Sequence, residues 1–136
     1  MNITYQIEND LSAEEFRTVL INSSLGERRP VNESQTLANM VEHGNLIVTA
    51  RDHGRLVGVS RSLTDFSYCT YLSDLAIDKE YQRQGIGKEL IRQTKLKTPS
   101  AKLILLAAPK ATSYYSRIGF QHHEQCYFLD KIDELV

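Results

Sequence analysis

The sequence has few cysteines and lacks any long apolar run, and each absence excludes a class of protein. Cys69 and Cys126 are the only thiols, and the amino terminus carries no apolar segment of the kind that directs secretion. Disulfides are rare in reducing compartments, so we expect two free thiols and a cytoplasmic location. No stretch is long and apolar enough to span a bilayer, so we expect no membrane partner.

Metal ligands at suitable spacing and an excess of positive charge are also missing. A metal site would need more cysteine or histidine ligands, and the adjacent His122 and His123 would point to opposite faces of a strand. We therefore expect no metal. The 16 lysines and arginines nearly cancel the 17 aspartates and glutamates. This balance does not favour nucleic acid as a partner.

The length of 136 residues predicts a single domain, residues 1–136, with a core that needs no disulfide or metal. Apolar periodicity predicts an α/β (α+β) fold with a mixed sheet. The expected strands are 3–7, 46–50, 56–60, 68–77 and 102–107, followed by one long or two short closing strands within 120–129. The expected helices are one capped by Ser12, one capped by Asn32, one within 83–97 and one over 111–118.

Two features of the sheet can be anticipated in more detail. A short turn with Gly54 separates segments 46–50 and 56–60, which predicts an antiparallel hairpin, and Gly58 suggests a bulge in its second strand. Segment 102–107 is almost wholly apolar, which is typical of a central strand covered on both faces. Because a helix separates it from strand 68–77, we expect these two strands to pair in parallel.

A strand, a glycine-bearing loop and an amphipathic helix follow one another within residues 71–91. Backbone N–H groups without helical partners and the positive end of the helix converge at such a turn. A Cβ at either glycine would hold the oxygens of an anion away from those donors. The turn therefore predicts a phosphate site, although two glycines also permit close helix packing. The loop residues are Gln82, Arg83, Gln84, Gly85, Ile86 and Gly87.

The spacing Q-x-x-G-x-G in this loop resembles motif A of the GCN5-related N-acetyltransferase (GNAT) family, whose loop receives the pyrophosphate of acetyl-coenzyme A (acetyl-CoA). Segment 109–120, P-K-A-T-S-Y-Y-S-R-I-G-F, resembles the later signature of the family. In that signature, a helix with paired aromatic residues ends in an apolar-glycine-aromatic turn. The resemblance implies the GNAT acyl-CoA N-acyltransferase fold, with six to seven strands, about four helices and a central parallel pair that splays apart.

The resemblance also implies where acetyl-CoA binds as co-substrate. In the family, the pantetheine arm lies in the gap between the splayed strands and bonds main-chain groups that match Leu75, Ala76 and Ile77. Arg83 and Lys88 can add side-chain charge to the loop, with solvated surface as the alternative.

One position departs from the family pattern. Ala111 stands where an asparagine often bonds the pantetheine arm, and alanine cannot replace that bond. A neighbour such as Thr112 or Ser113 could supply it.

For catalysis, the resemblance assigns Tyr115 as the proton donor to the leaving thiolate, with Tyr114 in the packing position. A backbone N–H near Leu75 or Ala76 would polarise the thioester carbonyl. Asp74 interrupts an apolar strand and matches an acidic residue in the glucosamine-6-phosphate N-acetyltransferase branch, which makes it the candidate base.

Other interpretations of these side chains stay open. Asp74 could instead bond a neighbouring loop or bind a cationic substrate, and Tyr115 could pack on the sheet. His122 or His123 is an alternative base, although the sequence favours a solvated pair of histidines over this role.

The resulting hypothesis is direct acetyl transfer from acetyl-CoA to a small-molecule or peptide amine in a ternary complex. There are two alternatives. One is an acyl-CoA-binding module without turnover, and the other is a transferase that acts on a protein or an aminoacyl-tRNA. Homodimers are frequent in the family, so the resemblance favours a homodimer.

Overall fold

The computed structural model describes residues 1–136 and divides the chain into two compact units, Met1–Leu106 and Ala107–Val136. The first unit contains one sheet in the order β1-β2-β3-β4-β5. Its strands are β1 (Ile3–Ile7), β2 (Leu46–Asp52), β3 (Arg55–Thr64), β4 (Cys69–Ile77) and β5 (Lys102–Ile104). Its helices are α1 (Ala13–Ser23), α2 (Ser34–His43) and α3 (Ile86–Lys97), with short 3₁₀ turns η1 (Leu25–Arg28) and η2 (Lys79–Tyr81).

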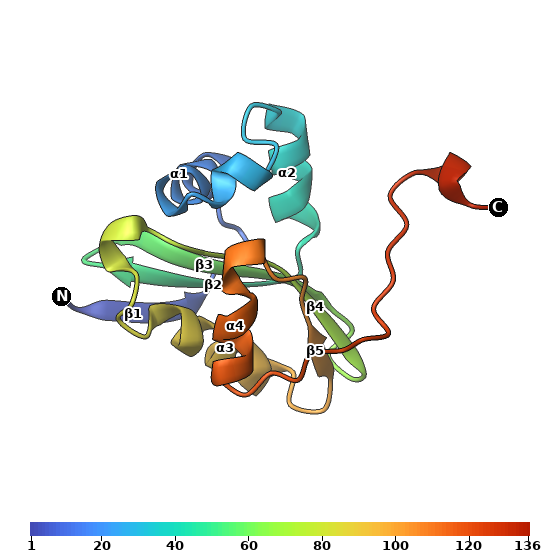
Figure 1. Cartoon of the computed structure of the whole chain (residues 1–136). Helices are drawn as coiled ribbons and strands as arrows, with labels where there is room; N and C mark the ends of the chain where they lie inside the picture. Colours follow the sequence, from blue (N-terminus) through green and yellow to red (C-terminus); the bar gives the residue numbers. More distant parts are fainter. The chain divides into compact units, whose positions relative to one another are not determined.

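Helices cover both faces of this sheet (Figure 1). On one face, Phe16 of α1 and Leu37 of α2 pack against Ala76 of β4, and all three are almost fully buried. On the other face, Leu90 of α3 packs with Val57 of β3. Both faces of β3 and β4 are therefore apolar within the first unit, which is the mixed layered arrangement that the periodicity predicts.

The starts of the first two helices show how local polar groups set their bounds. Ser12 caps α1 as predicted, and its hydroxyl accepts a hydrogen bond from the Glu15 N–H at 3.1 Å. The predicted cap of α2 is wrong by one residue, because Glu33 and not Asn32 occupies that position. The Glu33 N–H donates to the Pro30 carbonyl at 3.0 Å, so the chain is still in a turn at Asn32.

The hairpin of β2 and β3 contains the bulge that Gly58 suggested. Ala50 pairs with Gly58 and the next residue, Arg51, pairs with Leu56, so Val57 is the extra residue. A Cβ on Gly58 would lie 3.2 Å from the Leu90 side chain, which is tighter than ordinary packing. Glycine therefore lets α3 approach this strand closely.

The end of the sheet differs from the prediction. Residues 107–136 contain no strand, so the sheet has five strands, and the parallel pair of β4 and β5 lies at its edge instead of its centre. Only residues 102–104 of the expected strand 102–107 are in β5, and Ile104 is 51% exposed. An apolar run indicates burial without identifying a neighbour, and a strand persists only where a neighbour pairs with its backbone.

The second unit contains α4 (Thr112–Arg117) between the 3₁₀ turns η3 (Pro109–Ala111) and η4 (Ile132–Glu134). Gly119 follows α4 with φ of 109°, a conformation that glycine adopts without strain. The Phe120 N–H then donates to the Tyr115 carbonyl at 2.9 Å. The predicted helix and its glycine stop are therefore confirmed. None of the helices combines the length and the apolar character needed to cross a bilayer.

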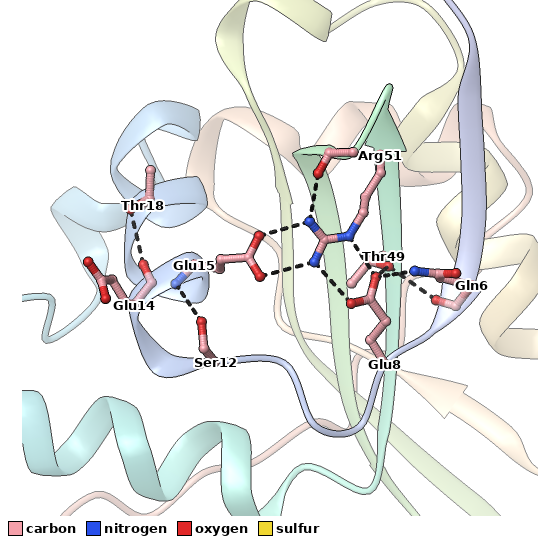
Figure 2. A network of polar contacts seen from close by, with 9 residues as sticks. Gln6, Glu8, Ser12, Glu14, Glu15, Thr18, Thr49 and Arg51 are labelled. Atoms are coloured by element: carbon pink, nitrogen blue, oxygen red, sulfur yellow. Dashed lines mark hydrogen bonds and ion pairs between the residues drawn. The ribbon is translucent and has the colours of Figure 1, made fainter.

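A charged network joins β2 to α1 and to the residues after β1 (Figure 2). The Arg51 guanidinium lies 2.8 Å from a carboxylate oxygen of Glu8 and 2.8 Å from one of Glu15. The Thr49 hydroxyl also donates to Glu8. Hydrogen bonds from Arg51 lower the pKa of Glu8 from its ordinary 4.5 to about 2, against the effect of burial. The network therefore fastens the first turn of α1 to the sheet.

We expect the Glu8 network to stabilise the fold above pH 4.5 and to lose this contribution as the pH falls from about 4.5 to about 2. The sign follows from linkage, because the unfolded chain binds the proton at a higher pH than the folded chain. Urea unfolding of the wild type and of Glu8→Gln should show a difference in unfolding free energy that shrinks across this range. The exposed Glu14 supplies a matched control, and Glu14→Gln should keep the wild-type pH dependence. A Glu8→Gln deficit that stays constant down to pH 2 would contradict this assignment.

Candidate active site

β4 continues well beyond the point where β5 stops pairing with it. Residues Cys69–Tyr71 pair in parallel with Lys102–Ile104, whereas β4 extends to Ile77. The edge of β4 that faces away from β3 therefore has no strand partner from Leu72 onward. The predicted splaying of the parallel pair is confirmed within the first unit.

The pairing of β4 with β3 identifies the backbone groups on this open edge. In an antiparallel pair, the N–H and C=O of one residue point to the same side, and successive residues alternate. The Asp78 N–H donates to the Val57 carbonyl at 2.8 Å, and Ala76 pairs with Val59. The backbone groups of Ala76 thus face β3, while those of Leu75 and Ile77 face the open edge. Of the two predicted positions for the polarising N–H, only Leu75 faces this edge.

At each end of the open edge, a side chain donates a hydrogen bond to a backbone carbonyl. Gln82 donates from Nε2 to the Ile77 carbonyl at 2.8 Å. Arg29 donates from Nη2 to the Ser73 carbonyl at 2.9 Å. Leu75 lies between these two positions and receives no side-chain hydrogen bond. Its N–H and C=O are therefore the groups that an extended ligand would meet.

The loop from Gln82 to Gly87 leads into α3 and leaves the start of that helix uncapped. Gly85 is the residue before the helix, its φ is 86°, and no side chain hydrogen-bonds to the first turn. A Cβ built on Gly85 would meet nothing within 4 Å, so the space in front of the loop is open. Positive φ thus requires the glycine, and the free N–H groups behind it suit an anion.

The start of this loop is anchored to the hairpin of β2 and β3. Asp78 accepts from the Glu80 N–H at 2.9 Å and pairs with Arg55 at 2.9 Å. The Tyr81 hydroxyl donates to Asp52 at 2.8 Å, which raises the pKa of Tyr81. These contacts hold the chain in place before it enters the loop.

The side chains of the other predicted loop residues differ in burial and in their hydrogen bonds. Ile86 is 2% exposed and packs in the core, so a cofactor contact there would use its backbone. Gln84 donates to the Glu80 carbonyl at 3.4 Å. Arg83 and Lys88 are exposed and form no ion pair, which leaves their charges available.

Asp74 is buried between two arginines. Its Oδ1 lies 2.5 Å from Arg29 Nε and its Oδ2 lies 2.5 Å from Arg61 Nε, and its side chain has no exposed surface. Both oxygens thus accept from guanidinium groups, and the buried carboxylate presents no exposed surface to an amine. Because Arg29 belongs to the loop after α1, these contacts favour the interpretation of Asp74 as a carboxylate bonded to a neighbouring loop.

The sequence reasoning missed the roles of Arg29 and Arg61. A signal for Arg61 existed, because it directly follows the predicted strand 56–60, and an arginine that is buried in a sheet needs a counter-charge. Arg29 precedes Asp74 by 45 residues, and no local pattern links the two.

Tyr115 and Ser113 belong to the second unit, whereas Asp74, Leu75 and the loop belong to the first. The Tyr115 ring lies edge-on to Tyr114 and Phe120, at centroid distances of 5.3 and 5.4 Å. Burial, and then the neighbouring Tyr114, raise the pKa of Tyr115 above 10.0. Its hydroxyl therefore keeps its proton at neutral pH, as a proton donor requires.

The other polar candidates of the second unit are exposed. Ser113 lies in α4 with an exposed side chain, and His122 is also exposed. His123 accepts at Nδ1 from the Gln125 N–H at 3.1 Å, within the same stretch of chain. These contacts do not select either histidine as a base.

Comparisons with known proteins agree with this arrangement. The model of the acetyltransferase (GNAT) domain matches residues 7–133. The structure is similar to a GNAT family acetyltransferase from Streptococcus pneumoniae, with a TM-score of 0.79 at 23% identity over 96% of this chain and 98% of that one. It is also similar to the aminoglycoside N-acetyltransferase AAC(6')-Iy solved with CoA, with a TM-score of 0.71 at 15% identity over 96% and 95% of the two chains. The chain therefore belongs to the GNAT family of acetyltransferases.

A curated relative extends the likeness to sequence. The histone acetyltransferase TAP1 of Glycine max is 29% identical over 105 residues, which are 69% of this chain and 46% of the relative. The chain thus spans about half the length of this relative.

We predict that Asp74→Asn lowers the unfolding free energy by about 3–5 kcal/mol, because it leaves the buried Arg61 and the partly exposed Arg29 without a counter-charge. Urea unfolding measures the change. The exposed Asp10 gives a matched control, and Asp10→Asn should change stability by no more than about 0.5 kcal/mol. Equal effects of the two substitutions would show that the ion pairs do not contribute to stability.

Proposed function

We propose that this GNAT acetyltransferase transfers the acetyl group of acetyl-CoA directly to a primary amine held in the same complex. The observation that carries the proposal is the open edge of β4 at Leu75, followed along the chain by the uncapped start of α3. An extended chain with amide groups can pair with such an edge, as a peptide does in strand addition. The pantetheine arm of CoA is a chain of this kind.

The described residues fit the two polar parts of the co-substrate. The C=O of Leu75 suits an N–H group of the pantetheine arm, which leaves the N–H of Leu75 for the thioester carbonyl. The free N–H groups at the start of α3 suit the diphosphate, because helix amino termini favour anions. Arg83 and Lys88 are exposed and can add positive charge there.

The proposed reaction needs few groups. The amine nitrogen forms a bond to the acetyl carbon as the bond from that carbon to sulfur breaks. The N–H of Leu75 stabilises the carbonyl oxygen as it becomes anionic, and the Tyr115 hydroxyl gives its proton to the leaving sulfur. The proton of the amine passes to water, since both oxygens of Asp74 are held by arginines.

A peptide amine is the second candidate acceptor. The likeness to a histone acetyltransferase supports it, although the chain spans only 46% of that relative. The acceptor panel should therefore include lysine-containing peptides as well as small amines such as polyamines, amino sugars and amino acids.

Two measurements on the wild-type chain test the proposal. Calorimetry should detect binding of CoA, and thiol release from acetyl-CoA should rise above background with at least one acceptor of the panel. Absence of CoA binding would contradict the proposal. Binding without turnover for any acceptor would favour the binding module that lacks activity.

We expect Tyr115→Phe to lower kcat by roughly 10²-fold, the lower end of the range for general acid catalysis, because the leaving sulfur loses its proton donor. The dissociation constant for acetyl-CoA should stay within about twofold, since the hydroxyl acts only in the transition state. Tyr114→Phe removes the neighbouring hydroxyl and should keep the wild-type kcat. Equal kcat values for the two variants would assign Tyr115 to packing.

A further inference from the structure

We propose that Arg29 and Arg61, joined through Asp74, hold a bulge in β4 in one conformation and thereby aim the N–H of Leu75 at the carbonyl oxygen of the thioester. The three side chains are positioning residues in this proposal, and we refer to them as the arginine clamp. The inference rests on the proposed function, because it concerns the group that polarises the thioester.

The bulge lies at the start of the open edge. Arg61 pairs with Asp74, and the next residue of β3, Ser62, pairs with Leu72. Ser73 is therefore an extra residue that opposes no partner. A bulge bends the strand and changes the direction of the groups that follow it, so its conformation determines where the Leu75 N–H points two residues later.

The two arginines of the clamp contact both residues at the centre of this bulge, Ser73 and Asp74. Arg29 donates to the Ser73 carbonyl at 2.9 Å, and Arg61 donates to the Ser73 hydroxyl at 3.0 Å. The same two guanidinium groups hold the Asp74 carboxylate at 2.5 Å each. Four side-chain hydrogen bonds thus converge on two consecutive residues of β4.

Each arginine also ties the bulge to a different part of the first unit. Arg61 donates from Nη1 to the Met40 carbonyl near the end of α2, at 3.1 Å. Arg29 donates from Nη1 to the carbonyl of Arg28, in the turn that follows α1. The bulge is therefore fixed from two sides, by elements that are far from it in the sequence.

The chemistry of the clamp indicates a role in geometry. Buried ionic networks cost desolvation energy, and well-packed apolar residues often give equal or greater stability. A guanidinium differs from an ammonium because its planar fork can hold two acceptors at fixed angles. Arg29 uses this fork to hold Asp74 and the Ser73 carbonyl together, and a lysine at that position could hold only one of them well.

Arg29 is the best position for a test, because its side chain is 23% exposed whereas that of Arg61 is 8% exposed. We expect Arg29→Met and Arg29→Lys both to lower kcat by at least 10-fold, since small displacements of a reacting geometry reduce rates steeply. The dissociation constant for acetyl-CoA should change by less than about threefold, because the anion-binding loop is untouched. Arg28→Met removes an exposed arginine from the same turn and is expected to keep the wild-type kcat.

A second readout does not depend on activity. Amide hydrogen exchange of the free protein, followed by NMR, should become faster at Asp74 and Ala76, which pair with β3 beside the bulge, in Arg29→Met and stay unchanged at Gly85. The inference would be overturned by unchanged exchange at these amides. It would also be overturned if Arg29→Lys restored the wild-type kcat, because charge alone would then be sufficient.

These outcomes separate the clamp from the proposed function. A wild-type chain that turns over no acceptor would contradict the proposed function, whereas the exchange rates in the Arg29 variants would still support or overturn the clamp. Normal wild-type turnover with unchanged exchange in Arg29→Met would overturn the clamp alone.

Discussion

The early end of the pairing between β4 and β5 is the feature on which the proposed site depends. Only three residues of each strand pair, and β4 then continues to Ile77 with one edge open. Backbone groups of a strand normally find partners, and unpaired ones are costly when they leave water. Here side chains hold the Ser73 and Ile77 carbonyls, and the groups of Leu75 between them stay available. The fold thus leaves the N–H and C=O of Leu75 without a partner, and a ligand can form hydrogen bonds with them.

Ion pairs of the buried Asp74 also constrain β4. Asp74 accepts from two guanidinium groups that come from a turn and from β3, and its side chain has no exposed surface. A carboxylate in this setting has a strong structural reason to be present without acting on a substrate. In our proposal, the amine therefore loses its proton by another route, and transfer to water is the simplest one.

Much of this arrangement could be predicted from the sequence, because it is local. Apolar periodicity located the five strands, Ser12 marked the start of α1, and glycine spacing located the loop before α3. The missing information concerns contacts between distant segments. The apolar residues of 120–129 suit a strand but do not specify a neighbour, and nothing near Asp74 indicates that Arg29, 45 residues earlier, binds it. The alternation of backbone groups that distinguishes Leu75 from Ala76 also required the observed register with β3.

An NMR titration of the labelled chain with CoA tests the central claim most directly. Our account predicts that CoA shifts the amide resonances of Leu75 and of Gly85, Ile86 and Gly87, because these N–H groups gain hydrogen bonds. Amides of β1, which lies at the opposite edge of the sheet, should not shift. Binding of CoA that leaves the Leu75 and loop resonances unchanged would contradict the account, because the ligand would then occupy another part of the molecule.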